Sequence, residues 1–281
     1  MARTQTSVAR RASKQDDLFR LGWRYKKRAT PNADGEFDYD IVPLRDEDLL
    51  YPQEDDFIVH NDNHITDVPY LRNVFKTQTA DSPRYRILCD HIIDFQHGDV
   101  QPLGPDITAL EGEPLEWDGS RGTFPVKDMQ SKVLFVLEDT SPSTRPKDLG
   151  PKVKLYYRAG VPLYILCDPP YGGGKRRARG ILPYRAGPKG YELQPLDANG
   201  RYWIEAIGVF IGIVDGRVVC FDKDGKRIED YTGLHSQLQS ERFRADEEKA
   251  RAEQEKARAE AAEARIRELE AKAKKQRRRK K

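Results

Sequence analysis

Two short apolar runs with a helical segment between them place the strongest constraint on how this chain folds. Residues 133–138 (VLFVLE) and 163–167 (LYILC) are short, strongly apolar and bounded by turn-forming residues, so we expect two buried strands. Between them, residues 147–159 favour a helix, since Pro151 is tolerated in a first turn and Gly160 suits a C-cap. Strands alternating with a helix indicate a sheet covered by helices, and therefore an α/β or α+β domain.

Further elements are predicted on both sides of this block. Apolar residues recur at helical spacing between residues 66 and 77, which predicts an amphipathic helix there. Apolar runs next to turn residues predict strands over residues 84–95 and 104–110. Asp215-Gly216 is a dipeptide typical of tight hairpins. The strands that it would join are residues 209–214 and 217–221.

The apolar residues are distributed unevenly and divide the chain into three parts. Only 37% of the 281 residues are hydrophobic, below the roughly 45–50% usual for globular domains. Nearly all large apolar side chains lie in the middle of the sequence. We therefore expect a basic, disordered N-terminal extension at residues 1–34, a sheet domain at residues 35–235, and a charged helix with a basic tail at residues 236–281.

Charge is also distributed unevenly. Residues 1–28 carry a net charge of +7 and residues 272–281 carry +8. Because the whole chain carries +3, the remaining residues carry −12. This chain is therefore not a uniformly basic nucleic-acid-binding protein, although its basic ends can add affinity for phosphates.

The predicted C-terminal helix contains a sequence repeat. Residues 244–271 form four seven-residue units, RADEEKA, RAEQEKA, RAEAAEA and RIRELEA. A seam made mostly of Ala and Glu is typical of a weak coiled coil, whereas Glu–Arg and Glu–Lys pairs four residues apart also stabilise a solitary helix. The sequence leaves both alternatives open: a single charged helix, or a homodimer through residues 236–272.

The cysteine and hydropathy patterns exclude several classes of protein. The three cysteines lie far apart and lack CxxC spacing, which argues against a disulfide framework and a zinc site. No apolar run approaches the length of a membrane-spanning helix, and the N-terminus lacks the apolar core of a secretory signal. We therefore expect a cytoplasmic protein with no membrane partner.

Two acidic residues and one lysine form the candidate catalytic set. Asp106 lies early in one predicted strand, Glu138 ends another, and Lys152 begins the second turn of the following helix. Two carboxylates on neighbouring strands can share one divalent ion, and a nearby ammonium can stabilise developing charge. The alternative is structural: Glu138 would accept amide protons at the helix N-terminus, and Lys152 would lie on a solvated face.

The segment that carries these residues resembles a known family. VLFVLEDTSPSTRPKDLGPKVKLYYRAGVPLYILCDP is similar to the central block of the Uma-two-type restriction endonucleases (DUF820-like), a branch of the PD-(D/E)XK nuclease superfamily. GPDI resembles the family's upstream Pro-Asp, and the resemblance extends over residues 58–235. It implies a restriction-endonuclease-like mixed sheet flanked by helices. It also implies Asp106 and Glu138 as metal ligands, with Lys152 as the third catalytic residue.

Some positions depart from the superfamily pattern. The superfamily places a lysine two residues after the glutamate, where this chain has Thr140. The resemblance implies that the lysine has migrated to the helix, as Lys152 or alternatively Lys154. Three further acids keep open roles. Asp139 could add a ligand or face solvent, Asp148 could pair with the helix dipole or act in catalysis, and Asp168 could neighbour a metal or form a turn.

Two functions follow from the resemblance and its departures. The first is a restriction-type endodeoxyribonuclease that uses Mg²⁺ (or Mn²⁺) on Asp106 and Glu138 to hydrolyse DNA phosphodiester bonds, with Lys152 assisting. The second is a catalytically inactive nuclease-fold scaffold that binds nucleic acid or protein through its basic ends and C-terminal helix. Thr140 and the acidic body favour this second hypothesis.

Overall fold

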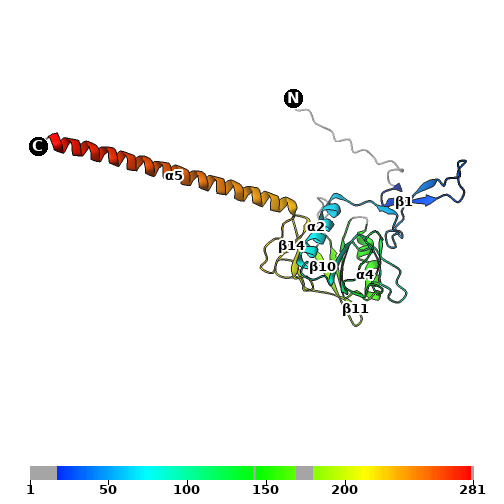
Figure 1. Ribbon diagram of the computed structural model, residues 1–281. Coiled ribbons are helices and arrows are strands. Elements are labelled where there is room, and N and C mark those ends of the chain that lie inside the picture. Colours follow the sequence, from blue (N-terminus) through cyan, green and yellow to red (C-terminus); the bar gives the residue numbers. More distant parts are fainter. Residues whose placement is uncertain (1–17, 142–143, 169–179, 280–281) are drawn as a thin grey trace, which may run out of the picture. The chain divides into compact units, whose positions relative to one another are not determined.

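The computed structural model describes residues 18–141, 144–168 and 180–279, and these divide into two compact units, one ending at Ile228 and one beginning at Glu229 (Figure 1). The first unit is a mixed α+β domain, and in the second the described residues are dominated by one long helix, as the sequence predicts. The helices are α2 (Asp62–Gln78), α3 (Arg145–Asp148), α4 (Pro151–Arg158) and α5 (Tyr231–Arg279).

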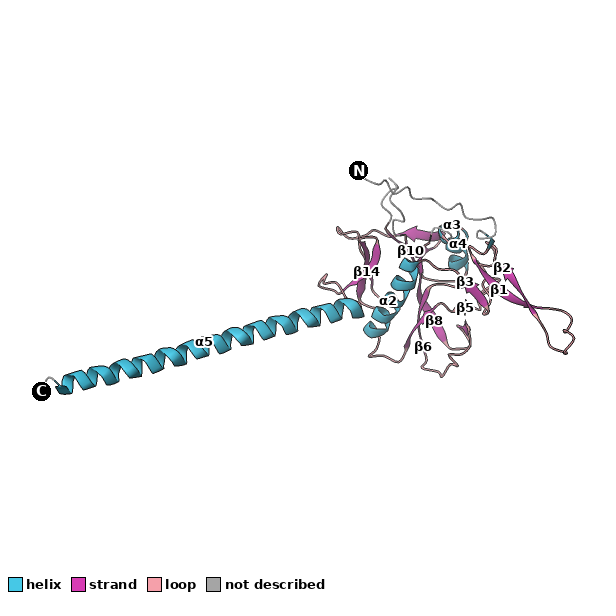
Figure 2. Ribbon diagram, turned by 90° about the horizontal axis from the view of Figure 1, so that it is seen from above, coloured by secondary structure: helices cyan, strands magenta, loops and turns pink. Residues whose placement is uncertain are grey.

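A six-stranded mixed sheet forms the centre of the first unit (Figure 2). The strand order is β11-β10-β9-β8-β6-β4, in which β8 and β9 run parallel and the other neighbours run antiparallel. The bounds are β4 (Tyr85–Cys89), β6 (Ile107–Gly112), β8 (Ser131–Asp139), β9 (Leu163–Cys167), β10 (Ile181–Gly187) and β11 (Gly190–Leu193). The strand-helix-strand block of the sequence therefore forms the parallel pair, with α3 and α4 in the connection.

Three smaller sheets accompany the central one. The first pairs β1 (Gly22–Lys27) with β2 (Tyr39–Pro43) and β3 (Asp56–Ile58). The second pairs β5 (Ile92–Asp94) with β7 (Thr123–Pro125), and the third has the order β12 (Tyr202–Ile204), β13 (Val209–Val214) and β14 (Arg217–Phe221). The hairpin predicted around Asp215-Gly216 is confirmed in β13 and β14.

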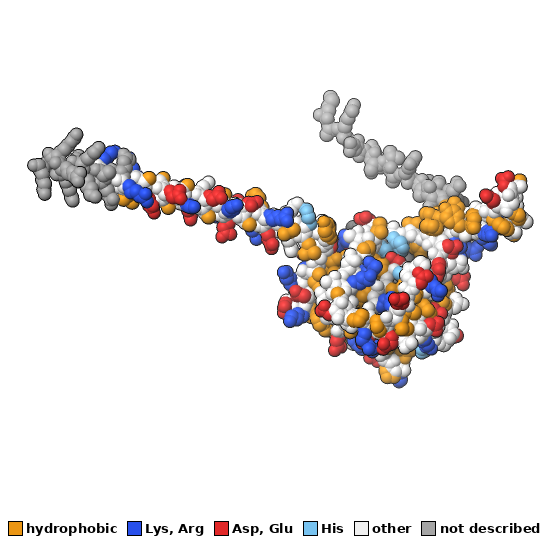
Figure 3. Space-filling view, viewed as in Figure 1, with side chains coloured by type: hydrophobic (Ala, Val, Ile, Leu, Met, Phe, Trp, Pro, Cys, Tyr) orange, Lys and Arg blue, Asp and Glu red, His pale blue; other side chains and the backbone are white. Residues whose placement is uncertain are grey.

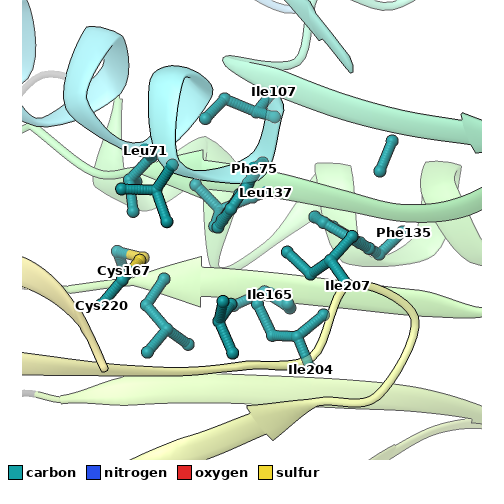
Figure 4. Packing of buried hydrophobic residues seen from close by; sticks show 14 of the residues in the cluster. Leu71, Phe75, Ile107, Phe135, Leu137, Ile165, Cys167, Ile204, Ile207 and Cys220 are labelled. Atoms are coloured by element: carbon teal, nitrogen blue, oxygen red, sulfur yellow. The ribbon is translucent and has the colours of Figure 1, made fainter. Parts of the chain in front are cut away.

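Both faces of the central sheet are buried. On one face, α2 and the β12–β14 sheet enclose a cluster that includes Leu71, Phe75, Leu137 and Ile165 (Figure 4). On the other face, α4 and the β5–β7 pair enclose a second cluster around Tyr156. Because strands buried on both faces need apolar side chains at successive positions, this packing explains the continuous apolar runs in the sequence.

Several predicted elements differ in extent from the observed ones. The helix predicted over residues 147–159 is divided into α3 and α4, because Pro151 has no N–H to continue the ladder from α3. The strand predicted over residues 84–95 is divided into β4 and β5 at Asp90, whose φ is 53°. The helix expected from residue 66 begins at Asp62, because the Asn61 side chain caps it.

The N-terminal extension departs from the expected disorder where it is described. Gly22–Lys27 form β1, although residues 1–17 of that extension lie outside the described residues. Trp23 stacks on Phe57, and Arg24 pairs with Asp56 at 2.7 Å. These partners lie about thirty residues away in the sequence, so local composition does not reveal them.

Helix α5 carries exposed side chains wherever they are described. The Arg267–Glu263 pair, at 3.3 Å, is one of the intrahelical ion pairs that the repeat predicts. Among the described helices, none is long and apolar enough to span a membrane.

Candidate active site

The candidate site lies where β6 begins beside the end of β8. Asp106 immediately precedes β6, and Glu138 is the penultimate residue of β8. The antiparallel register pairs Ile107 with Leu137, and extending it by one residue sets Asp106 opposite Glu138. The backbone N–H of Asp139 donates to Oδ2 of Asp106 at 2.6 Å. The two acids that the sequence predicts as metal ligands are therefore neighbours across the strands.

Glu138 is held by two side chains of α4. Lys152 Nζ donates to Glu138 Oε1 at 2.8 Å, and the Tyr156 hydroxyl donates to the same oxygen at 2.5 Å. Lys152 is only 4% exposed and Glu138 only 2% exposed, so the ion pair is buried. Neither residue therefore has the solvated or helix-capping role that the alternative reading gave them. Lys154, the other candidate lysine, is exposed.

Asp148 joins this buried pair from α3. Its Oδ1 lies 3.2 Å from Lys152 Nζ, and its side chain is almost entirely buried. The four-residue spacing that the sequence shows between Asp148 and Lys152 therefore becomes a direct ion pair, although the two residues belong to different helices. One ammonium thus faces carboxylates from β8 and from α3.

Burial and neighbouring charges shift the pKa values of Asp106, Glu138 and Lys152. Burial raises the pKa of Asp106 and Glu138 well above the ordinary range, and the Lys152 ammonium offsets only part of that effect. Burial alone would lower the pKa of Lys152, but Glu138, Asp148 and Asp106 together raise it. The lysine therefore stays charged, while Asp106 and Glu138 retain protons to unusually high pH.

Asp139, the residue after Glu138, is buried on the opposite side of β8. Burial is the main cause that raises the pKa of Asp139 to about 8. Neither of its carboxylate oxygens has a hydrogen-bond partner among the described residues. Of the two roles left open by the sequence, facing solvent is thus excluded by the burial of this side chain.

A histidine that the sequence did not single out also faces the site. His64 lies in the first turn of α2, with Nδ1 3.8 Å from Oδ2 of Asp106 and 3.3 Å from the backbone oxygen of Asp139. Its ring stacks on that of His60 at 4.1 Å between centroids. Burial lowers the pKa of His64, so the imidazole is neutral at pH 7, the form that binds metals.

Asp90 completes a group of three potential metal ligands. One ligand atom from each of His64, Asp90 and Asp106 lies within 4.8 Å of the others. Asp90 occupies the turn after β4, and its backbone N–H donates to the Asp106 carbonyl at 3.0 Å. The three residues are far apart in the sequence and share no ligand spacing, so only the folded chain reveals the group. In the sequence, the feature that points to this group is Asp90 itself, an acidic residue inside the apolar run of residues 84–95.

Asp168 and Thr140 form a separate contact next to the site. Arg145 binds the Asp168 carboxylate with Nε and Nη2, at 2.9–3.1 Å, and Thr140 donates to it at 3.2 Å. Asp168 therefore links the end of β9 to α3. Thr140, which stands in the usual lysine position, is buried and contributes to this contact.

A cleft of about 450 Å³ connects the site to the surface. Its walls include Trp23, Phe57, His60, Asp90 and Asp106. Asp106 is thus a ligand candidate on the wall of an open cleft, whereas Glu138 and Lys152 are not among its lining residues.

The donor set fits a divalent cation. Carboxylate oxygens are the ligands that Mg²⁺ and Mn²⁺ prefer, and a neutral imidazole is the form of histidine that binds metal ions. Among the described residues, the Nε2 atom of buried His64 has no hydrogen-bond partner, and the same holds for both carboxylate oxygens of Asp139. A cation would stabilise the ionised form of these carboxylates, whose pKa values burial raises.

Comparison with known proteins places this site in a family. The model of the Uma2 family, described as "Putative restriction endonuclease", matches residues 68–209. The chain belongs to the Uma2 family. The match confirms the resemblance stated from the sequence, and its span includes Asp90, Asp106, Glu138 and Lys152 but begins after His64.

One solved structure is also similar to this Uma2 chain. It is the crystal structure of "a putative nuclease belonging to DUF820" from Anabaena variabilis ATCC 29413. The two chains share 14% sequence identity, with 59% of this chain and 75% of that chain covered, at a TM-score of 0.36. A comparison with curated proteins gives no match.

Proposed function

We propose that this Uma2 protein is a divalent-metal-dependent endonuclease that hydrolyses phosphodiester bonds in DNA. The observation that carries the proposal is the position of Asp106 opposite Glu138, with a buried lysine bound to Glu138. Membership of a family described as restriction endonucleases supports the same reaction class. In this proposal, Asp106 and Glu138 are metal ligands and Lys152 is the third catalytic residue.

The metal would be held chiefly by oxygen atoms. Asp106 and Glu138 would provide carboxylate oxygens, and His64 and Asp90, whose ligand atoms lie within 4.8 Å of one of Asp106, are further candidate ligands. When bound, Mg²⁺ or Mn²⁺ would lower the pKa of a coordinated water and offset the charge that develops at phosphorus.

Residues of the chain itself position the proposed ligands. Tyr156 and Lys152 bind the same oxygen of Glu138 and so fix the orientation of its carboxylate. The Asp139 N–H does the same for Asp106. Since ligand groups held by hydrogen bonds lose little freedom on binding, the site is preorganised for a cation and for an attacking water.

The proposal is tested by plasmid nicking with Glu138→Gln, which keeps the size of the side chain but removes its charge. We expect the variant to lose at least about 10-fold in Mg²⁺- or Mn²⁺-dependent nicking, because loss even of a residue that only supports a metal ligand costs about 10–100-fold in metal affinity or activity. Glu111→Gln, at the other end of β6, is the matched control, because Glu111 pairs with the surface residues Lys132 and Arg84. Equal nicking by the wild type and Glu138→Gln would overturn the assignment.

The rival function, a catalytically inactive scaffold, is favoured by one specific observation. Thr140 occupies the usual lysine position and is committed to Asp168. A scaffold of this kind would bind nucleic acid or protein without binding metal at Glu138. Absence of nicking by the wild type, combined with retained DNA binding, would favour this second function.

A further inference from the structure

The sheet β1–β3 presents a row of aromatic rings on one face. The register pairs Trp23 with Phe57, and Tyr25 with Ile41, so these side chains lie on the same side of the sheet. Tyr39, opposite Lys27, extends the row. Figure 3 shows hydrophobic side chains gathered over the region labelled β1 in Figure 1.

This aromatic face is exposed, whereas the other face holds the sheet together. Tyr25 is 45% exposed, Tyr39 58% and Phe57 50%. On the opposite face, Arg24 binds Asp48 and Asp56, and Ile58 packs against a small cluster of leucines. The aromatic rings therefore do not belong to the leucine cluster that packs on this sheet, and burial in that cluster does not explain why they are aromatic.

The chemistry of the face favours nucleobases. Its large side chains are mostly rings rather than aliphatic groups, and every nucleobase has a π-face that can stack on such rings. Trp23 and Phe57 lie nearly parallel, with 9° between their planes and 5.6 Å between centroids.

Positive charge borders the rings. Lys27 lies on the aromatic face, opposite Tyr39, and its Nζ lies 3.7 Å from the centroid of the Phe37 ring. Lys26 and Lys27 also line a hollow with Tyr25 and Tyr39, and the acids of that hollow, Glu47, Asp48 and Asp55, lie outside the aromatic strands β1–β3. Cations beside stacking rings are the combination that binds single-stranded nucleic acid, since lysines attract phosphates while the rings hold bases.

The aromatic face is continuous with the candidate active site. Trp23 and Phe57 line the same cleft as Asp90 and Asp106. A strand whose bases stack on these rings would therefore have its backbone within reach of the proposed metal ligands. In a duplex the base faces are covered by neighbouring pairs, so only unpaired nucleotides can use this surface.

From this placement we infer that the face of β1–β3 is a stacking platform for unpaired DNA bases, and that the substrate of the site is DNA with a single-stranded stretch. The inference rests on the proposed nuclease function and adds the structural class of the substrate. The rings that form the platform are Trp23, Tyr25, Tyr39 and Phe57.

Fluorescence anisotropy of the full chain in EDTA tests the platform, because binding is then measured without cleavage. The probes are a labelled 20-nucleotide dT strand and a labelled 20-base-pair duplex at the same salt concentration. We expect the dT strand to bind at least ten-fold more tightly than the duplex. Tyr25→Ala combined with Tyr39→Ala should weaken dT binding at least about five-fold, as expected for loss of base stacking.

The matched control combines Tyr25→Phe with Tyr39→Phe, which keeps both rings and should retain the wild-type affinity. Because both tyrosines are exposed, circular dichroism should show the same fold for all variants. Equal binding of dT by the alanine and wild-type chains would overturn the platform. So would an alanine variant that loses only self-association in sedimentation velocity, since the face would then bind a second copy.

Plasmid nicking by the same preparations separates this inference from the proposed function. If nicking depends on Glu138 but dT binding does not depend on the rings, the platform is wrong and the nuclease assignment stands. If dT binding depends on the rings but the wild type does not nick DNA with Mg²⁺ or Mn²⁺, the nuclease assignment fails, and with it the inferred substrate.

Discussion

At the scale of single residues, Lys152 is the side chain on which the candidate site depends most. It is buried, it bonds to Glu138, and it lies 3.2 Å from Asp148. A buried ion pair contributes little net stability compared with an apolar pair, but loss of one partner leaves a buried charge uncompensated. The lysine therefore makes a structural contribution as well as the proposed catalytic one, and the two can be measured separately.

Lys152→Met should destabilise the metal-free protein by about 3–5 kcal/mol, because it removes the buried ammonium that contacts both Glu138 and Asp148. Urea unfolding at pH 7 measures this change. Lys154→Met, two residues away on the exposed side of α4, should shift stability by no more than about 0.5 kcal/mol. Similar stabilities of the two variants would contradict the role assigned to Lys152.

The sequence predicted some of these residues but not others. Asp106, Glu138 and Lys152 could be named in advance because they lie in or near one recognisable block. His64 and Asp90 could not, because their relation to Asp106 arises from the packing of α2 and the turn after β4. The burial of Asp139 also could not be predicted, because it depends on the packing of α2 against β8. A local sequence pattern indicates the helix but not the strand on which it packs.

At the scale of elements, predictions were most accurate where one segment is apolar throughout. The strand over residues 163–167 and the hairpin strands around Asp215-Gly216 have the predicted bounds. Errors arose where backbone geometry interrupts a pattern, as at Pro151 and at Asp90. Strand β1 was missed because its segment is basic and polar, and because Asp56 and Phe57, which contact it from β3, lie about thirty residues away.

Helix α5 presents apolar side chains through which two copies of the chain could associate. Ile266 and Leu269 are its exposed apolar residues near the C-terminal end, at 56% and 52% exposure. Since these two residues occupy the seam of the seven-residue repeat, we expect the chain to form a weak homodimer through them. Ile266→Gln combined with Leu269→Gln should weaken the dimer in sedimentation equilibrium.

Ala257→Gln is the control for the dimer, because Ala257 lies off the seam of the same helix. It should leave the association constant unchanged. A wild-type chain that is monomeric, or a dimer that both variants retain, would show that α5 is a solitary charged helix.

At the scale of the whole molecule, the sheet domain is acidic and holds the carboxylates of Asp106 and Glu138 in place by hydrogen bonds. Asp106 also lines an open cleft. Burial raises the pKa of Asp106 and Glu138, so both acids keep their protons to higher pH than exposed acids do. A cation must displace those protons in order to bind. The proposed site therefore binds metal more tightly as pH rises, and Mn²⁺ binding should release protons.

Calorimetric titration of the full chain with Mn²⁺ at pH 8 tests the central claim most directly. We expect one site in the wild type and in Glu111→Gln, and at least ten-fold weaker binding in Asp106→Asn, which keeps an oxygen to accept the Asp139 N–H. The wild-type affinity should fall when the titration is repeated at pH 6. Equal Mn²⁺ affinities for the wild type and Asp106→Asn, or no binding by either, would contradict the account.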